Sequence, residues 1–342
     1  MQFVLDEILD REIMHYADYG LHISSRYNTI YIERQDEVTR IPLPDDGWKS
    51  ILGGNRLARR ALRLDKCNVM PVGNDLVIIR QGQVYHYSSD GKKLSKTLTL
   101  RNCRNLLHQS IAVLEDGQIF FGEYGNNSGR KEVPIYRSRD GGRTWETVFL
   151  FPQGRIKHVH GCYWDPFEEK IWVFTGDFAG ECYLLCADKN FQKVEWIGDG
   201  QQAYRTCNAF FEPDAIHWIM DSQLEDSYHV RMDRRGRTIA IKQAFPGPVW
   251  YIKRLQDGYY LAATAQEIGP GVHDRDAHLL VSQDLEHWDD LARFPHDGLP
   301  KRYFKFGVVG FADGLQTSAA FYLFFEALRG LDGKTAHCHL KV

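Results

Sequence analysis

The sequence lacks the features of several large protein classes. No stretch approaches the ~20 apolar residues of a membrane span, and residues 1–7 have no basic segment ahead of an apolar run. Excess basic charge is missing too, because the net charge of the 342 residues is −3. We therefore expect no membrane and no nucleic acid as partners. We expect a cytoplasmic protein, or a periplasmic or extracellular one if a leader precedes this sequence.

Cofactor motifs and cysteine pairs are absent as well. The chain has no P-loop, no GxGxxG followed by a helix and no GxSxG elbow, which excludes the common nucleotide and serine-hydrolase motifs. Its 7 cysteines are odd in number, irregularly spaced and without a CxxC pair. This argues against a zinc ribbon and a disulfide framework. We expect no cofactor and interpret several cysteines as small buried hydrophobic residues.

One segment that is present has a specific pattern. It reads Ser138-Arg139-Asp140-Gly141-Gly142-Arg143-Thr144-Trp145 and fits S-x-D-x-G-x-T-W. Such a pattern suits a tight β-hairpin turn, because the aspartate caps turn amides and a glycine supplies a positive φ. The tryptophan then packs back between the sheets. We therefore predict that Asp140 stabilises a turn and has no catalytic role.

Weaker copies of this turn recur along the whole chain. The aspartates placed at the turns are spaced 45 to 54 residues apart: Asp36, Asp90, Asp140, Asp188, Asp233, Asp284 and Asp332. A period of this size is typical of β-propellers, whose four-stranded blades need about 40–50 residues. We predict an all-β, seven-bladed β-propeller with four-stranded antiparallel blades, forming a single domain over residues 1–342. Six blades are the alternative, because Asp36, Asp233 and Asp332 match weakly.

Helical periodicity is confined to two short regions. These are residues 4–14 and residues 48–62, where residues 55–61 are predicted to form a short connecting helix. A closed propeller has few exposed strand edges, so we expect a monomer.

The order of strands within a blade separates the loops into two faces. If strands A to D run outward from the axis, the aspartate turns join C to D on one face. The starts of A strands and the ends of B strands meet on the opposite rim, at the mouth of the central channel.

The candidate catalytic residues on this rim are His158, His160, Asp177, Asp221, Glu123 and Tyr124. The candidate substrate-binding residues are Arg205, His108, Tyr204, Trp250, Tyr251 and Lys305. Imidazoles, carboxylates and an arginine on one rim are typical of a catalytic or polar-ligand site, although any one carboxylate can instead cap loop amides.

The turn motif and the repeat length resemble the Asp-box, or BNR-repeat, sialidase-like β-propeller superfamily. Residues His158-Val159-His160-Gly161, Asp165-Pro166, Trp172 and Thr175-Gly176-Asp177 resemble an H-x-H…DP…W…TGD pattern of BNR-repeat proteins associated with polysaccharide genes. The resemblance implies a propeller that handles carbohydrate, but not a typical sialidase. Arg40-Ile41-Pro42 matches the R-I-P letters of a sialidase, yet we expect it on an outer strand of the first blade.

The preferred function is a polysaccharide lyase that acts on an acidic glycan or oligosaccharide. In β-elimination His158 or His160 takes the proton at C5, since a histidine titrates near neutral pH. Arg205 grips the uronate carboxylate, and Tyr124 or Tyr204 protonates the leaving oxygen.

Two other functions use the same rim. A glycoside hydrolase would pair Asp177 with Asp221 or Glu123 as its two carboxylates. A non-catalytic glycan-binding or scaffold propeller would stack sugars on aromatic residues of the rim, namely Trp250, Tyr251, Tyr303 and Phe304.

A metal site is also conceivable at this rim. His158 and His160, two residues apart on a strand, share one face, and with Asp177 they could bind a divalent ion. Hydrogen-bonded channel histidines are the more common arrangement, so we predict no metal.

Overall fold

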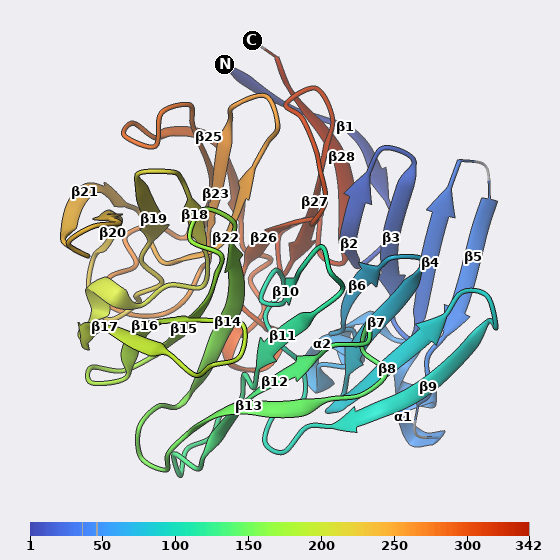
Figure 1. Ribbon diagram of the computed structural model, residues 1–342. Coiled ribbons are helices and arrows are strands. Elements are labelled where there is room, and N and C mark those ends of the chain that lie inside the picture. Colours follow the sequence, from blue (N-terminus) through green and yellow to red (C-terminus); the bar gives the residue numbers. More distant parts are fainter. Residues whose placement is uncertain (36, 46, 342) are drawn as a thin grey trace. The chain divides into compact units, whose positions relative to one another are not determined.

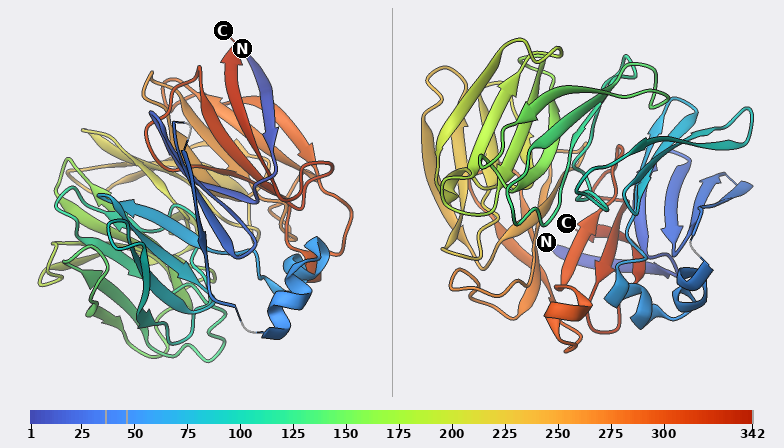
Figure 2. Two further views of the ribbon diagram at one scale, coloured as in Figure 1. Left: turned by 90° about the vertical axis from the view of Figure 1, so that its right-hand side faces the viewer. Right: turned by 90° about the horizontal axis from the view of Figure 1, so that it is seen from below.

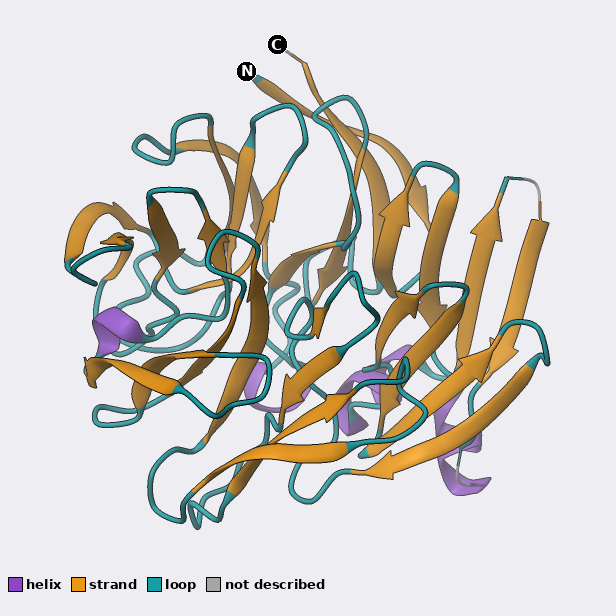
Figure 3. Ribbon diagram, viewed as in Figure 1, coloured by secondary structure: helices purple, strands orange, loops and turns teal. Residues whose placement is uncertain are grey.

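The computed structural model describes residues 1–35, 37–45 and 47–341, and nearly all of its regular structure is strand (Figure 3). Within these residues the strands form seven four-stranded sheets. The fold is therefore a seven-bladed β-propeller with antiparallel blades, as predicted, and not a six-bladed one. None of the helices in this part of the chain is both long and apolar enough to cross a membrane.

The blades fall into two compact units. One unit contains Met1–Lys66, Gln223–Asp226 and Phe245–Val342, and the other contains Cys67–Ser222 and Ser227–Ala244. We call them the terminal unit and the central unit, because the first holds both chain ends.

The terminal unit contains three blades and three short helices (Figure 1). The first blade is β2 (Ile13–Asp18), β3 (Leu21–Arg26), β4 (Thr29–Arg34) and β5 (Glu37–Pro42). The sixth is β22 (Val249–Arg254), β23 (Tyr260–Thr264), β24 (Asp276–Ser282) and β25 (Asp289–Pro295). The seventh is β26 (Val308–Phe311), β27 (Phe321–Glu326), β28 (Lys334–Lys341) and β1 (Gln2–Leu9). The helices are α1 (Gly47–Gly53), α2 (Arg56–Leu62) and α3 (Lys301–Phe304).

The seventh blade is completed by the first strand of the chain. β1 pairs antiparallel with β28, with Gln2 opposite Lys341, so the two termini lie side by side (Figure 2). Because its outermost strand comes from the N-terminus, this blade has no turn from C to D. Asp332, predicted in such a turn, lies instead between β27 and β28. Asp36 falls outside the described residues.

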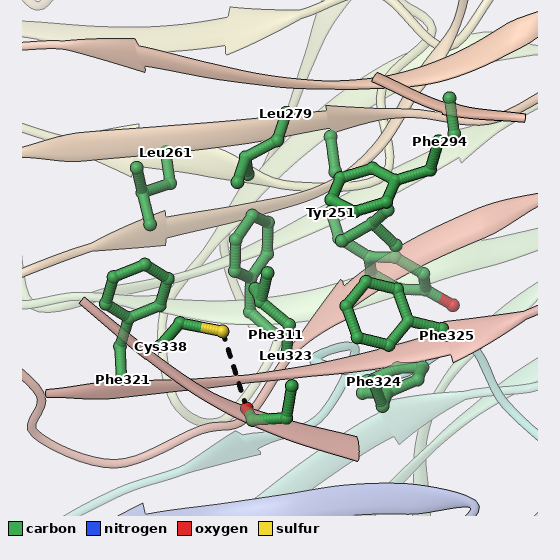
Figure 4. Packing of buried hydrophobic residues seen from close by; sticks show 14 of the residues in the cluster. Tyr251, Leu261, Leu279, Phe294, Phe311, Phe321, Leu323, Phe324, Phe325 and Cys338 are labelled. Carbon is green, nitrogen blue, oxygen red and sulfur yellow. Dashed lines mark hydrogen bonds between the residues drawn. The ribbon is translucent and has the colours of Figure 1, made fainter. Parts of the chain in front are cut away.

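Apolar residues from neighbouring strands form the core of the terminal unit (Figure 4). Phe321, Phe324 and Phe325 lie on β27 and are at most 1% exposed. The thiol of Cys338 on β28 lies in the same core and donates to the carbonyl of Ala336 at 3.6 Å. All 7 cysteines are buried and none forms a disulfide bond, as the sequence predicted.

The helix expectations were half right. Residues 4–14 are not helical but contribute to β1 and β2. The second region does contain helices, and α2 begins after Asn55, whose side chain accepts from the amides of Leu57 and Ala58. This is a standard N-cap, and it explains why the helix starts there.

The central unit contains the other four blades. The second blade is β6 (Asn68–Val72), β7 (Asp75–Arg80), β8 (Gln83–Ser88) and β9 (Lys93–Thr99). The third is β10 (Ala112–Val113), β11 (Ile119–Gly122), β12 (Val133–Ser138) and β13 (Glu146–Phe151). The fourth is β14 (His158–Asp165), β15 (Lys170–Gly176), β16 (Cys182–Ala187) and β17 (Val194–Gly200). After the short 3₁₀ helix η1 (Gln202–Tyr204), the fifth is β18 (Ala209–Phe211), β19 (Ala215–Ile219), β20 (Ser227–Asp233) and β21 (Ile239–Phe245).

The turn from β12 to β13 has the geometry predicted for Ser138 to Trp145. The Asp140 carboxylate accepts from the amides of Arg143 at 3.1 Å and Thr144 at 2.9 Å. Gly142 has φ +90°, a conformation that favours glycine. The indole of Trp145 packs edge-on against Phe121 and donates to Thr97 Oγ1 at 3.0 Å. Asp140 is therefore a turn-capping residue.

Candidate functional site

Two adjacent strands of the fourth blade bring two histidines and an aspartate together. His158 begins β14, opposite Gly176 at the end of β15, and Asp177 follows directly. A Cβ atom on residue 176 would lie 2.6 Å from the ring of His160, so this close approach requires glycine. The sequence Thr-Gly-Asp thus places a carboxylate beside the imidazoles at the end of the blade.

Both nitrogens of each imidazole are in contact with protein oxygen atoms. His158 Nδ1 lies 2.7 Å from the carbonyl oxygen of Gly125, and His160 Nδ1 lies 2.8 Å from that of Thr206. The two Nε2 atoms lie 3.2 Å and 3.1 Å from the same oxygen, Asp177 Oδ1. Each ring nitrogen therefore already lies beside a protein oxygen atom.

A lysine and an arginine contact the same aspartate. Lys157 Nζ donates to Asp177 Oδ2 at 2.5 Å. Arg205 Nη1 donates to the main-chain carbonyl of Asp177 at 3.0 Å, and its Nη2 lies 3.5 Å from Oδ1. Burial raises the pKa of Asp177, but the hydrogen bonds from His158 and His160 outweigh it and hold the pKa far below its usual range. Asp177 is therefore ionised at neutral pH.

A second carboxylate lies deeper in the same unit. Asp221 follows β19 and is only 3% exposed, and Arg205 Nη2 lies 3.4 Å from its Oδ2. The Cys207 thiol donates to the same oxygen at 3.2 Å. Burial, with a further contribution from Asp221, raises the pKa of Cys207 well above its usual value. The thiol thus stays protonated, and the negative charge of Asp221 offsets the positive charge of Arg205.

The group opens to solvent at one end. The side chains of Asp177 and Lys157 are 14% and 16% exposed, whereas His158, His160 and Arg205 are almost completely buried. Phe178 is exposed, and its ring centre lies 5.5 Å from Lys157 Nζ. We call Lys157, His158, His160, Asp177 and Arg205 the histidine–aspartate site.

Aromatic and cationic side chains border this opening. The half-buried ring of Tyr124 lies 4.2 Å from that of His158, and the Arg130 guanidinium lies 5.4 Å from the Phe178 ring. The sequence pattern identifies Tyr124 but not Lys157, Phe178 or Arg130. Lys157 and Phe178 directly flank His158 and Asp177 in the chain, and that adjacency is the only signal that could have found them.

Three other predicted residues of the central unit have different surroundings. The Glu123 carboxylate accepts from the amides of Arg101 at 2.6 Å and Asn102 at 2.8 Å and from the Tyr136 hydroxyl at 2.9 Å. This is the loop-capping arrangement considered as the alternative. Tyr204 ends η1 and packs against Trp218. His108 is buried in the segment before β10.

The remaining predicted residues belong to the terminal unit. Trp250 donates to Glu267 Oε1 at 2.8 Å. Tyr251 is 1% exposed within the hydrophobic core, so its ring is closed to a ligand in this structure. Lys305 donates to Asp65 at 2.8 Å and Glu326 at 3.2 Å. Arg40-Ile41-Pro42 lies on β5, the outermost strand of the first blade, as expected.

The fold is shared with solved structures at low sequence identity. YCF48, in a structure described as bound to D1 peptide, has a TM-score of 0.57 and 13% identity over 100% of this chain and 96% of its own. A chain of the mitotic checkpoint complex gives a TM-score of 0.58 and 11% identity over 99% and 95%. The extracellular domain of BT4673 from B. thetaiotaomicron has a TM-score of 0.55 and 12% sequence identity, but this chain covers only 39% of its length. No protein-family model and no curated protein matches the chain. These similarities establish the propeller fold.

Proposed function

We propose that the histidine–aspartate site is the active site of a carbohydrate-active enzyme that cleaves an acidic glycan by β-elimination. One observation carries the proposal: five titratable side chains converge, largely buried, and open to solvent only at Asp177 and Lys157, beside the exposed ring of Phe178. Clustered ionisable groups at an opening are the usual mark of a reactive site.

The border of the opening suits an acidic sugar. Phe178 offers an apolar ring face on which a sugar ring can stack. Lys157 Nζ and the Arg130 guanidinium lie 5.5 Å and 5.4 Å from the centre of this ring. Positive charge beside a stacking surface attracts a uronate carboxylate.

The contacts change which residues are assigned to proton transfer. Because both nitrogens of His158 and His160 have protein partners, we assign the role of the base to the amine of Lys157. The amine takes the C5 proton, the electron pair forms the C4–C5 double bond, and the C4–O bond breaks. Tyr124 gives its phenolic proton to the leaving oxygen. No water is consumed.

The carboxylates favour elimination over hydrolysis. A glycosidase needs two carboxyl groups that both reach the scissile bond. Asp221 is 3% exposed, and Glu123 already accepts three hydrogen bonds. Asp177 alone of the three lies at the opening.

The test is a screen of the purified protein against acidic polysaccharides. Elimination creates an unsaturated product that absorbs ultraviolet light, and Lys157→Met should lower its rate by about 10²–10⁴-fold. Lys189→Met, an exposed lysine near the turn from β16 to β17, should leave the rate unchanged. If new reducing ends appear without ultraviolet absorbance, the activity is that of a hydrolase and not of a lyase. Binding without turnover on every polymer would make the site a binding site.

We also infer that the chain belongs to the Asp-box, sialidase-like superfamily. The capping geometry of Asp140 supports this, since it is the geometry expected of an Asp-box turn. The place of Arg40-Ile41-Pro42 on an outer strand supports an activity other than that of a sialidase.

A further inference from the structure

The contacts of His158 and His160 fix which nitrogen of each ring faces Asp177. A carbonyl oxygen only accepts, so the contacts to Gly125 and Thr206 require a proton on Nδ1 of each ring. A neutral ring then has a lone pair on Nε2. Both lone pairs then face the carboxylate oxygen Asp177 Oδ1, 3.1–3.2 Å away. A cation placed among these three atoms would contact both lone pairs and the carboxylate oxygen at once.

We propose that His158 Nε2, His160 Nε2 and the Asp177 carboxylate bind a divalent transition-metal ion, with Zn²⁺ as the representative. Two imidazoles and one carboxylate are a donor set that such ions prefer. One divalent ion supplies the same charge as two additional protons and forms coordinate bonds to all three ligands.

The spacing of the three atoms agrees with such a site. Zinc bonds of about 2.0–2.1 Å place neighbouring ligand atoms of a tetrahedron about 3.3–3.4 Å apart. The two Nε2–Oδ1 separations are 3.2 Å and 3.1 Å, and all three ligand atoms lie within 4.8 Å of one another.

The outer contacts are also those of metal-binding histidines. Such a histidine usually donates its other ring N–H to a carbonyl or carboxylate, which fixes the tautomer and aims the ligating nitrogen. Both rings already have this contact, to Gly125 and Thr206. The two carbonyl groups belong to different loops, so the orientation of each imidazole ring is fixed independently of the other.

The charged side chains around the three ligand atoms are compatible with a bound ion. Lys157 bonds to Oδ2 of Asp177, so Oδ1 is the oxygen that faces the imidazoles. Arg205 Nη2 lies 3.5 Å from Oδ1, and Asp221, 3.4 Å from the same nitrogen, offsets the charge of this guanidinium. An overlapping group, His160 with Cys207 and Asp221, is a poorer candidate. There His160 Nδ1 is taken by Thr206, and the thiol already donates to Asp221.

The role of the ion, unlike its binding, rests on the proposed function. Three protein ligands leave a fourth position, as in catalytic zinc sites, and Asp177 lies at the opening. A uronate carboxylate bound at that position would have its charge neutralised.

Metal binding is measured on the full chain, without any glycan. Chelator-treated protein is loaded with Zn²⁺ or Co²⁺, dialysed and analysed for metal content, and the Co²⁺ form is examined for the visible bands of a tetrahedral site. We expect one ion per chain, retained over Mg²⁺ and Ca²⁺. His158→Gln and Asp177→Asn should each weaken binding by more than about 100-fold, beyond the loss of an outer-sphere partner. His287→Gln, an exposed histidine on the turn from β24 to β25, is the matched control.

The outcomes separate this inference from the proposed function. A wild-type chain that retains no ion, or variants that retain it as well as the wild type, would overturn the metal site. Turnover that persists after chelator treatment would overturn the role of the ion and leave the lyase standing. A bound ion with the tetrahedral Co²⁺ spectrum supports the site even if no glycan is cleaved. Because the spectrum is measured on the wild type, the result does not depend on the folding of any variant.

Discussion

Each unit of the protein buries a carboxylate among basic side chains, but the bases differ. In the terminal unit Asp65, which follows α2, contacts Lys305 at 2.8 Å and Arg56 at 2.5 Å. In the central unit Asp177 contacts Lys157 and two imidazoles. Lysine and arginine keep their charge at neutral pH, whereas an imidazole changes its charge with its surroundings. The two arrangements thus differ in their imidazoles, which only the central unit places against its buried carboxylate.

The terminal network connects segments far apart in the sequence. Arg56 on α2 forms a two-pronged pair with Asp332 at 2.9 Å and 2.8 Å and also contacts Glu12. Lys305 contacts Glu326 at 3.2 Å as well as Asp65. Burial raises the pKa of Asp65, but the opposing effect of Lys305 and Arg56 is larger, so the pKa lies below its usual value. Each buried carboxylate in this network contacts a lysine or an arginine.

The largest effect should come from removing the central cation of the terminal network. Lys305→Met leaves Asp65 and Glu326 buried without their shared ammonium, and breaking a buried pair costs about 3–5 kcal/mol. Denaturant unfolding measures the loss. Lys334→Met, which removes an exposed pair with Asp10, should cost no more than about 1 kcal/mol. Equal losses in the two variants would contradict a structural role for the network.

Acid should weaken the terminal network in a defined direction. The folded pKa of Asp65 is lowered, so its contribution is fully present above the unfolded value of about 3.9. It is lost as pH falls from there through the lower folded pKa, at up to about 1.4 kcal/mol per pH unit. Asp65→Asn should flatten the stability profile below about pH 4. If this variant does not fold, the NMR titration of Asp65 in the wild type gives the same answer, and an ordinary pKa there would refute the prediction.

Asp177→Asn should destabilise the protein less than Lys305→Met. The amide keeps the shape of the carboxylate, and water can reach the opening to solvate Lys157, which is 16% exposed. We expect a loss of about 1–2 kcal/mol in metal-free protein, measured by the same unfolding experiment. A loss as large as that of Lys305→Met would mean that both units use their carboxylates for stability.

The smallest effect should come from the opposite end of the central unit. Asp140→Ala removes the cap of the turn from β12 to β13 and should cost about 1 kcal/mol, as lost capping residues do. Because this turn lies between C and D strands, away from the end of β15, turnover should not change. Impaired turnover with an intact fold would show that the two ends of the unit are coupled.

The period of the turns was enough to predict the number of blades. Asp140, Asp188, Asp233 and Asp284 all cap backbone amides of turns between C and D strands. Asp332 fits the same period but lies between β27 and β28, because β1 supplies the last strand of that blade. The spacing of residues cannot reveal which strand of a closing blade comes from the other end of the chain.

The site was predicted less completely than the fold. Alternation along the strands placed His158 and His160 at the start of an A strand and Asp177 at the end of the adjacent B strand, where they meet. It could not distinguish Glu123, which caps a loop, from Asp177, which lies at the opening. Both follow a B strand in the sequence and differ only in the loop that folds over them.

The sequence by itself determined the repeat, the turn chemistry and the end of each blade at which polar residues gather, because these depend on residues close together in the chain. Tertiary structure decided which of those polar residues meet. The carbonyls of Gly125 and Thr206 fix the rings of His158 and His160 from separate loops. Such contacts join residues more than thirty positions apart, and local periodicity holds no record of them.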